Sequence, residues 1–254
     1  MNPIITGDAD KNFKNFNRDF NIYVMSIDRW NAIMTKNLFE YCVYVVREEQ
    51  AAKYREAGID DMLVIPKGAV HDFMSTFYWI IANTPEKVIC IVDDDVKVMC
   101  YRNDKRYPIT DKDGNPDRET ATMECERIGQ ILYDLNLGLA FDNPNYASYI
   151  YDREFGFKGM PGHIRWVNKA AFKAKLDEND PAKSDIDMAM QELLLNRVIL
   201  LPKYYCTTAL MDTNAGAAEA RKAHIDMTIA MHNKWGQYYE YDYRKNIARI
   251  GVKR

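Results

Sequence analysis

The sequence lacks the features that would place the protein in several specialised classes. No apolar run approaches the length of a membrane span, and the first residues lack the basic start and long apolar region of a signal peptide. A net charge of −3 provides no overall attraction to nucleic acid, so any such binding needs a local patch. No linker, internal repeat or low-complexity segment divides the 254 residues. We therefore expect a single domain without a membrane partner.

Cysteine is also scarce. The five cysteines are an odd number, they are widely scattered, and no CxxC pair occurs. Cys42, Cys90 and Cys206 lie in apolar runs typical of strands, and we interpret them as reduced core residues. Reduced thiols favour a cytoplasmic location. The 47% hydrophobic and 28% charged fractions are those of an ordinary globular chain.

The most informative stretch is the apolar run 88–92, which is followed directly by Asp93, Asp94 and Asp95. Five apolar, mostly β-branched residues predict a strand buried on both faces of a largely parallel sheet. Its carboxyl end is where open α/β sheets bind ligands, and three adjacent carboxylates repel one another unless a cation lies among them. Asp93 and Asp95 therefore suit Mg²⁺ or Mn²⁺, bound together with substrate phosphates. A solvated acidic turn is the alternative interpretation.

Strand and helix patterns alternate up to this stretch, which predicts βαβ units and a parallel sheet. The predicted strands are 20–26, 41–46, 62–65 and 88–92, and the predicted helices are 30–39, 47–58 and 70–83. Right-handed crossovers bring the carboxyl ends of parallel strands to one edge of the sheet. We therefore expect Ser26, Arg29, Arg47 and Lys67 to converge with the three aspartates.

The second half of the chain carries a further acidic segment. Its predicted strands are 97–101, 162–167 and 198–201, its predicted helices are 119–137, 169–176, 188–196 and 217–231, and its loops include 103–118 and 141–160. Asp185 and Asp187 come directly before the helix at 188–196, so they are candidate catalytic carboxylates. The alternative is that these acids only cap the helix and complement its dipole.

These pieces resemble a known family. Asp93-x-Asp95 after three βα units, with Ser184-Asp185 opening a later helix, is similar to the nucleotide-sugar-dependent glycosyltransferases of the GT-A fold. The loop Asn214-x-Gly216, the helix after it and the segment Lys234-Trp-Gly resemble a narrower branch, the TET/JBP-associated glycosyltransferases. That branch is largely phage-borne and is thought to glycosylate hydroxymethylated pyrimidines in DNA. The general resemblance covers about 20–235, and the narrower one about 184–254.

The resemblance implies a mixed, mostly parallel α/β sheet flanked by helices in one domain, 1–254. Residues 20–100 would form the nucleotide-sugar half, 101–235 the acceptor and catalytic half, and 236–254 an aromatic and basic tail. It also implies a set of roles for the candidate residues. The donor would contact Ser26, Arg29, Arg47, Lys67, Asp93 and Asp94, and the metal would contact Asp93, Asp95 and either His224 or His232. Asp185, with Asp187 in reserve, would be the base if the reaction inverts configuration, and the acceptor would contact Gly162, His163, Arg165, Trp166, Asn214 and Gly216.

The implied reaction moves a sugar from a nucleotide diphosphate sugar, by default a UDP-sugar, with Mn²⁺ or Mg²⁺ as cofactor. The implied acceptor is phage DNA in the host cytoplasm, its flipped base held among the tyrosines of 146–151 and its phosphates by a basic patch. The candidate residues of that patch are Lys222, Lys234, Arg244, Lys245, Arg249, Lys253 and Arg254. Three alternatives stay open: a saccharide or protein acceptor, a nucleotidyltransferase, and a non-catalytic nucleic-acid or sugar-binding module. Nucleotidyltransferases usually carry a glycine-rich or basic phosphate loop near the first strand, and residues 25–29 contain no glycine.

Overall fold

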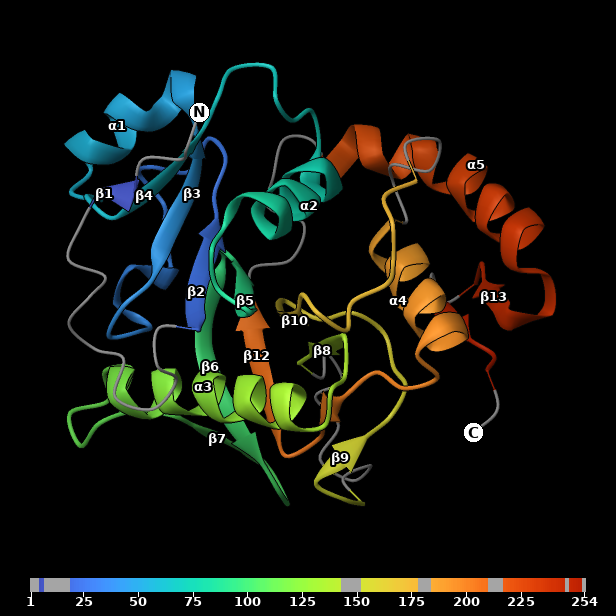
Figure 1. Ribbon diagram of the computed structural model, residues 1–254. Helices are drawn as coiled ribbons and strands as arrows, with labels where there is room; N and C mark the ends of the chain where they lie inside the picture. Colours follow the sequence, from blue (N-terminus) through green and yellow to red (C-terminus); the bar gives the residue numbers. More distant parts are fainter. Residues whose placement is uncertain are drawn as a thin grey trace.

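The computed structural model describes residues 5–6, 19–142, 152–177, 184–209, 217–244 and 247–252; for residues 5–6, 217–225 and 247 it describes the backbone only. These residues form a mixed central sheet with helices on both faces (Figure 1). In spatial order its seven strands are β1 (Ile5–Thr6), β4 (Met62–Ile65), β3 (Val43–Arg47), β2 (Phe20–Met25), β5 (Val88–Asp93), β10 (Ile164–Asn168) and β8 (Leu139–Phe141). The expected fold class, a mostly parallel α/β sheet flanked by helices, is confirmed.

The strand directions determine where the site forms. Strands β4, β3, β2 and β5 are parallel, as predicted, whereas β10 runs antiparallel to β5. Ile164 at the start of β10 is paired with Val92 near the end of β5. The amino end of β10 therefore lies beside the carboxyl end of β5, which carries the aspartates.

Both faces of the sheet are covered because side chains alternate along each strand. Phe20, Ile22 and Val24 of β2 pack into one core, while Tyr23 and Met25 pack into the other. The first core includes α1 (Ala51–Glu56) and α3 (Arg118–Asp134), and the second includes α2 (Phe73–Asn83) and α4 (Ser184–Leu195). Helix α3 lies close to the sheet at Gly129, where an added Cβ would be 2.7 Å from the Phe20 ring.

Smaller elements complete the described structure. Strands β7 (Arg106–Pro108), β6 (Val96–Arg102) and β12 (Tyr205–Ala209) form a second sheet, and β9 (Phe155–Gly156) pairs with β11 (Leu201–Pro202). Helix α5 (Ala217–Trp235) leads into the hairpin β13 (Tyr239–Asp242) and β14 (Ile247–Ile250). Short 3₁₀ helices span Thr35–Asn37, Glu48–Gln50 and Gly236–Tyr238. None of the described helices has the length and hydrophobicity of a membrane span. The five cysteines are all free. Cys90 and Cys206 are buried as expected, whereas Cys42 is only partly buried.

Two predicted helices are wrong. Residues 169–176 form a turn followed by irregular chain, because the backbone amides of Lys173 and Ala174 donate to the carboxylate of Glu192 at 2.6 and 2.7 Å. Contacts to another element thus replace the hydrogen bonds within a helix. Residues 30–39 contain only the 3₁₀ turn Thr35–Asn37, and the amide of Met34 donates to the carbonyl of Asp94 at 3.2 Å. The predicted strand at 198–201 is reduced to the two-residue β11.

Candidate metal and nucleotide site

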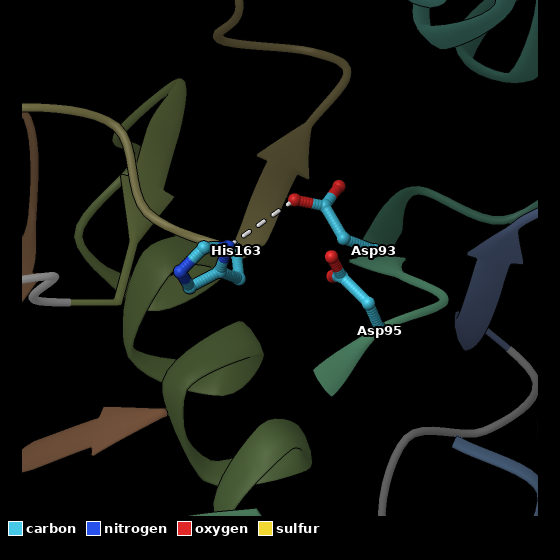
Figure 2. A group of neighbouring side chains, drawn as sticks. All are labelled: Asp93, Asp95 and His163. Carbon is cyan, nitrogen blue, oxygen red and sulfur yellow. Dashed lines mark ion pairs between the residues drawn. The ribbon is translucent and has the colours of Figure 1, made fainter. Parts of the chain in front are cut away.

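Two carboxylates and an imidazole meet at the carboxyl end of β5. Ligand atoms of Asp93, Asp95 and His163 all lie within 4.8 Å of one another, and their side chains face a common point (Figure 2). The sheet brings them together, since His163 directly precedes β10 and its carbonyl accepts a hydrogen bond from the Asp93 amide at 3.0 Å. Two carboxylate oxygens and one ring nitrogen at this spacing can bind a divalent cation.

Arg165 neutralises the first of these carboxylates. Its Nη1 donates to Asp93 Oδ1 at 2.9 Å, while His163 Nδ1 lies 3.5 Å from Asp93 Oδ2. Burial disfavours the charged form of Asp93, but the charges and hydrogen bonds of Arg165 and His163 outweigh it and hold the pKa of Asp93 below its usual range. Asp93 is therefore ionised in the folded protein, with one oxygen held by Arg165 and the other facing His163.

Two negatively charged neighbours, Asp93 and Asp142, raise the pKa of His163. Burial lowers the pKa of His163, but its hydrogen bond to Asp93 and the negative charges of Asp142 and Asp93 reverse the shift, so the net pKa lies above the ordinary value. A cation bound among the carboxylates would reverse this balance, because only the neutral ring can act as a metal ligand.

The middle carboxylate, Asp94, points toward the segment that follows β2. Asp94 Oδ2 accepts a hydrogen bond from Ser26 Oγ at 2.6 Å, and Oδ1 lies 3.6 Å from Arg29 Nε. Burial raises the pKa of Asp94 to about 6, and the Ser26 hydrogen bond and the Arg29 charge only partly oppose it. The Ser26 hydroxyl also pairs with Tyr54 Oη at 2.7 Å. Asp94 therefore ties the end of β5 to the segment after β2.

Arg29 links the remaining carboxylate to this network. Its Nη2 lies 3.8 Å from Asp95 Oδ2, and its side chain is only 12% exposed. Burial and the charge of Asp93 raise the pKa of Asp95, while Arg29 partly offsets them. The predicted convergence of Ser26 and Arg29 with the aspartates is thus present in the structure.

The other predicted donor contacts, Arg47 and Lys67, end the two strands farther along the sheet. Arg47 closes β3, and its Nε is buried without a hydrogen-bond partner among the described residues. Lys67 follows β4 and is exposed, with its backbone amide bound to Glu48 Oε2 at 3.0 Å. No described contact joins either side chain to the aspartates, so their role in binding a nucleotide stays a prediction.

The two carboxylates of α4 differ sharply in environment. Asp185 is partly exposed, accepts a hydrogen bond from the Ile186 amide at 2.8 Å, and its charge raises the pKa of Arg165. Asp187 is 1% exposed, and it accepts hydrogen bonds from Trp235 Nε1 at 2.8 Å and from Lys234 Nζ at 3.0 Å. Asp187 thus ties the end of α5 to α4 and is closed to an acceptor, which argues against it as the reserve base.

The residues predicted to contact the acceptor lie in different environments. Trp166 is fully buried, and its Nε1 donates to the Cys125 carbonyl at 2.9 Å, so the prediction that it contacts an acceptor is wrong. Gly162 lies against Asp142, whose Oδ1 an added Cβ would overlap. His163 and Arg165, assigned to the acceptor by the resemblance, lie instead at the metal-site carboxylates.

The structure describes only some of the candidate residues in the C-terminal part of the chain. His232 is exposed at the end of α5, with Nδ1 3.4 Å from the Tyr239 carbonyl, and among the described residues it joins no group of potential metal ligands. Its assignment as a metal ligand is therefore not supported by the geometry. Several other candidates lie outside the described residues: Asn214, Gly216, the tyrosines of 146–151, Lys245, Lys253, Arg254 and the side chains of Lys222 and His224.

Sequence reasoning missed Asp142, a fully buried carboxyl beside the site. Its Oδ1 accepts a hydrogen bond from the Ile164 amide at 2.8 Å, and its Oδ2 accepts one from Thr207 Oγ1 at 2.6 Å. Burial raises the pKa of Asp142, while these hydrogen bonds partly oppose the shift. Asp142 fixes the start of β10, and so the position of His163. Its place directly after the strand-like 139–141 was the available signal.

The fold and the site together define a class of architecture: the chain has a GT-A-type fold. It is similar over 92% of its length to the crystal structure of glucosyl-3-phosphoglycerate synthase from Mycobacterium tuberculosis bound to Mn²⁺, UDP-glucose and phosphoglyceric acid. That match covers 90% of the synthase, with a TM-score of 0.53 and 6% identity. The complex of the same synthase with Mn²⁺, UDP and phosphoglyceric acid matches with a TM-score of 0.54, 6% identity and 92% and 87% of the two chains.

A crystal structure of a mycobacterial protein matches to the same degree, with a TM-score of 0.54, 7% identity and 92% and 84% coverage. The sequence itself matches no protein-family model and no curated protein. At this identity the structural similarity establishes the fold.

Proposed function

We propose that the protein is a divalent-metal-dependent glycosyltransferase that takes a sugar from a nucleotide diphosphate sugar. The observation that carries the proposal is the meeting of Asp93, Asp95 and His163 at the carboxyl end of β5, within a GT-A-type fold. Structures of the similar synthase contain UDP or UDP-glucose with Mn²⁺ or Mg²⁺, which supports the same donor class and the same cofactors here.

The residues divide the work as follows. Asp95, Asp93 and His163 would hold the cation, which neutralises the charge that develops on the departing diphosphate. Arg165 helps to keep Asp93 ionised, because its Nη1 donates a hydrogen bond to Asp93 Oδ1 at 2.9 Å. Asp94, hydrogen-bonded to Ser26, orients the segment that carries Arg29, and Arg29 together with Arg47 and Lys67 would meet the nucleotide.

Asp185 is the candidate base. It lies in the first turn of α4, and its negative charge contributes to the raised pKa of Arg165, the partner of Asp93, which supports this choice. In an inverting transfer the acceptor oxygen attacks the anomeric carbon, the bond from that carbon to the diphosphate oxygen breaks, and Asp185 takes the hydroxyl proton. A retaining transfer needs no such base, so Asp185→Asn would then reduce turnover only modestly.

For the acceptor we propose the hydroxymethyl group of a modified pyrimidine in phage DNA. The support is the resemblance of 184–254 to the DNA-modifying branch. A saccharide or protein hydroxyl is the alternative within the same reaction.

The test is a thermal-shift panel of UDP, UDP-glucose and other nucleotide sugars, each with Mn²⁺, Mg²⁺ or EDTA. A ligand at about 100 times its Kd raises the melting temperature of a domain of this size by about 5 °C or more. We expect a shift with one nucleotide that needs the metal and is lost in Asp95→Asn. Asp113→Asn is the matched control, because Asp113 is exposed in the loop before α3.

The donor found in this way is then incubated with hydroxymethylated DNA, unmodified DNA and simple saccharides. Release of nucleoside diphosphate with one acceptor confirms the transfer and identifies the acceptor. Release of pyrophosphate would indicate a nucleotidyltransferase, and binding without turnover a binding module. A panel without any metal-dependent shift refutes the proposal.

A further inference from the structure

A cavity lies away from the metal site, between the end of α5 and the β13–β14 hairpin. It has a volume of about 400 Å³, within the range of small-molecule sites. In Figure 1 this hairpin and the end of α5 lie beyond α4 from the strands β5 and β10 that carry the metal-site residues. The residues that line the cavity are Thr228, His232, Gln237, Tyr239, Glu240, Tyr241 and Tyr243.

The aromatic residues of the cavity have different roles. Tyr239 is 1% exposed and packs with Met231 of α5 and with α4, so it anchors the hairpin. Tyr241 packs at the edge of the same cluster, and its ring meets that of Tyr243 at 74° with centroids 4.9 Å apart. Tyr243 is 63% exposed and takes no part in that cluster. The rings of Tyr241 and Tyr243 therefore form an aromatic corner, which is exposed to solvent on the side of Tyr243.

The polar residues around this corner define the chemistry of a ligand. Glu240 and Gln237 are exposed, and His232 lies on the facing turn of α5. A carboxylate and an amide accept and donate hydrogen bonds to hydroxyl groups, while aromatic rings pack on apolar C–H faces. No lysine or arginine is among the described residues that line the cavity, and a carboxylate is, so a polyphosphate or nucleic-acid backbone is poorly matched. A neutral polyhydroxylated ligand with one apolar face matches both features.

We infer that this cavity is a saccharide-binding site separate from the metal centre. The saccharide packs a C–H face against the Tyr241–Tyr243 corner and directs its hydroxyl groups to Glu240 and Gln237. Binding needs neither a divalent cation nor a nucleotide, because no residue of the metal site lines the cavity. Saccharide binding at this cavity does not depend on the proposed transfer reaction.

The experiment is saturation-transfer-difference NMR on the full chain in EDTA, without nucleotide. The probes are glucose, galactose, mannose, N-acetylglucosamine and α- and β-linked disaccharides of glucose, each in the millimolar range typical of weak binding. We expect saturation of ring protons in at least one probe. Tyr243→Ala should weaken that binding several-fold, and Tyr243→Phe, which keeps the ring, should retain it.

Tyr133→Ala is the matched control, since Tyr133 is a 43% exposed tyrosine on α3 that does not line the cavity. Far-UV circular dichroism of each variant checks that the fold is intact, which the exposure of Tyr243 favours. The inference is overturned if no probe binds at tens of millimolar, or if Tyr243→Ala binds as tightly as Tyr133→Ala. Because metal and nucleotide are absent, neither result bears on the transferase proposal.

Discussion

The ion pair between Arg165 and Asp93 allows a sharp test of how the site is held together. Arg165→Met removes the guanidinium, whose Cζ lies 4.9 Å from the centre of the Phe73 ring, but keeps much of the apolar stem. The change leaves Asp93 at the end of β5 without its 2.9 Å partner. Removing one partner of a buried pair costs about 3–5 kcal/mol, because a charge is left uncompensated.

The structure places the expected cost at the lower end of that range. The Arg165 side chain is 6% exposed, but that of Asp93 is 22% exposed and keeps His163 at 3.5 Å. We therefore expect a loss of about 3 kcal/mol in the free energy of unfolding, measured by urea denaturation in EDTA. This corresponds to a fall of about 6–12 °C in melting temperature.

Two further variants make the result specific. Arg153→Met breaks the exposed pair with Asp152, whose side chains are 65% and 49% exposed, and should cost less than about 1 kcal/mol. Asp93→Asn in the Arg165→Met background should recover more than half of the loss, because it removes the unpaired charge. Equal costs for the two arginine variants, or no recovery in the double variant, would refute the reasoning.

Two other predictions follow from groups beside this pair. Burial raises the pKa of Asp94 from 3.8 to about 6, so the folded state binds a proton more tightly than the unfolded state, and stability should fall as the pH rises from about 4 to 6. Urea unfolding in EDTA across this range should show a smaller pH-dependent loss of stability in Asp94→Asn than in the unsubstituted protein. Identical pH profiles for the two proteins would contradict the burial of Asp94. Gly162→Ala should cost about 1–3 kcal/mol and weaken Mn²⁺ binding, since the new Cβ overlaps Asp142 Oδ1 beside His163. Gly156→Ala, with its nearest contact at 3.5 Å, is the calorimetric control and should be nearly neutral.

The first half of the sheet could be predicted because its signals are local. The run 88–92 is fully buried as β5, and the alternation of strands and helices up to it predicted the parallel strands and the approach of Ser26 and Arg29 to the aspartates. Strand ends converge by topology alone, so no long-range information was needed.

The second half could not be predicted in the same way, because its geometry depends on long-range pairing. Residues 162–167 have the pattern of a strand, but the pattern does not specify an antiparallel position beside β5, and that position brings His163 and Arg165 to Asp93. An arginine that alternates with Ile164 and Trp166 in a buried strand was an available signal, since such a charge needs a counter-ion. Residues 169–176 have helical spacing, yet Glu192 of α4 takes their amides.

The pairing of β10 with β5 also predicts the order in which the site is completed during folding. Asp93 and Asp95 lie close together in the sequence, but His163 lies about seventy residues farther along. It reaches the two aspartates only through the pairing of β10 with β5, a contact of high sequence separation. A partly folded chain would therefore hold the cation weakly, and full affinity would appear only when the last central strand has paired. Under the proposed function, metal affinity would then report whether the central sheet is complete, and a bound cation would slow the separation of β10 from β5.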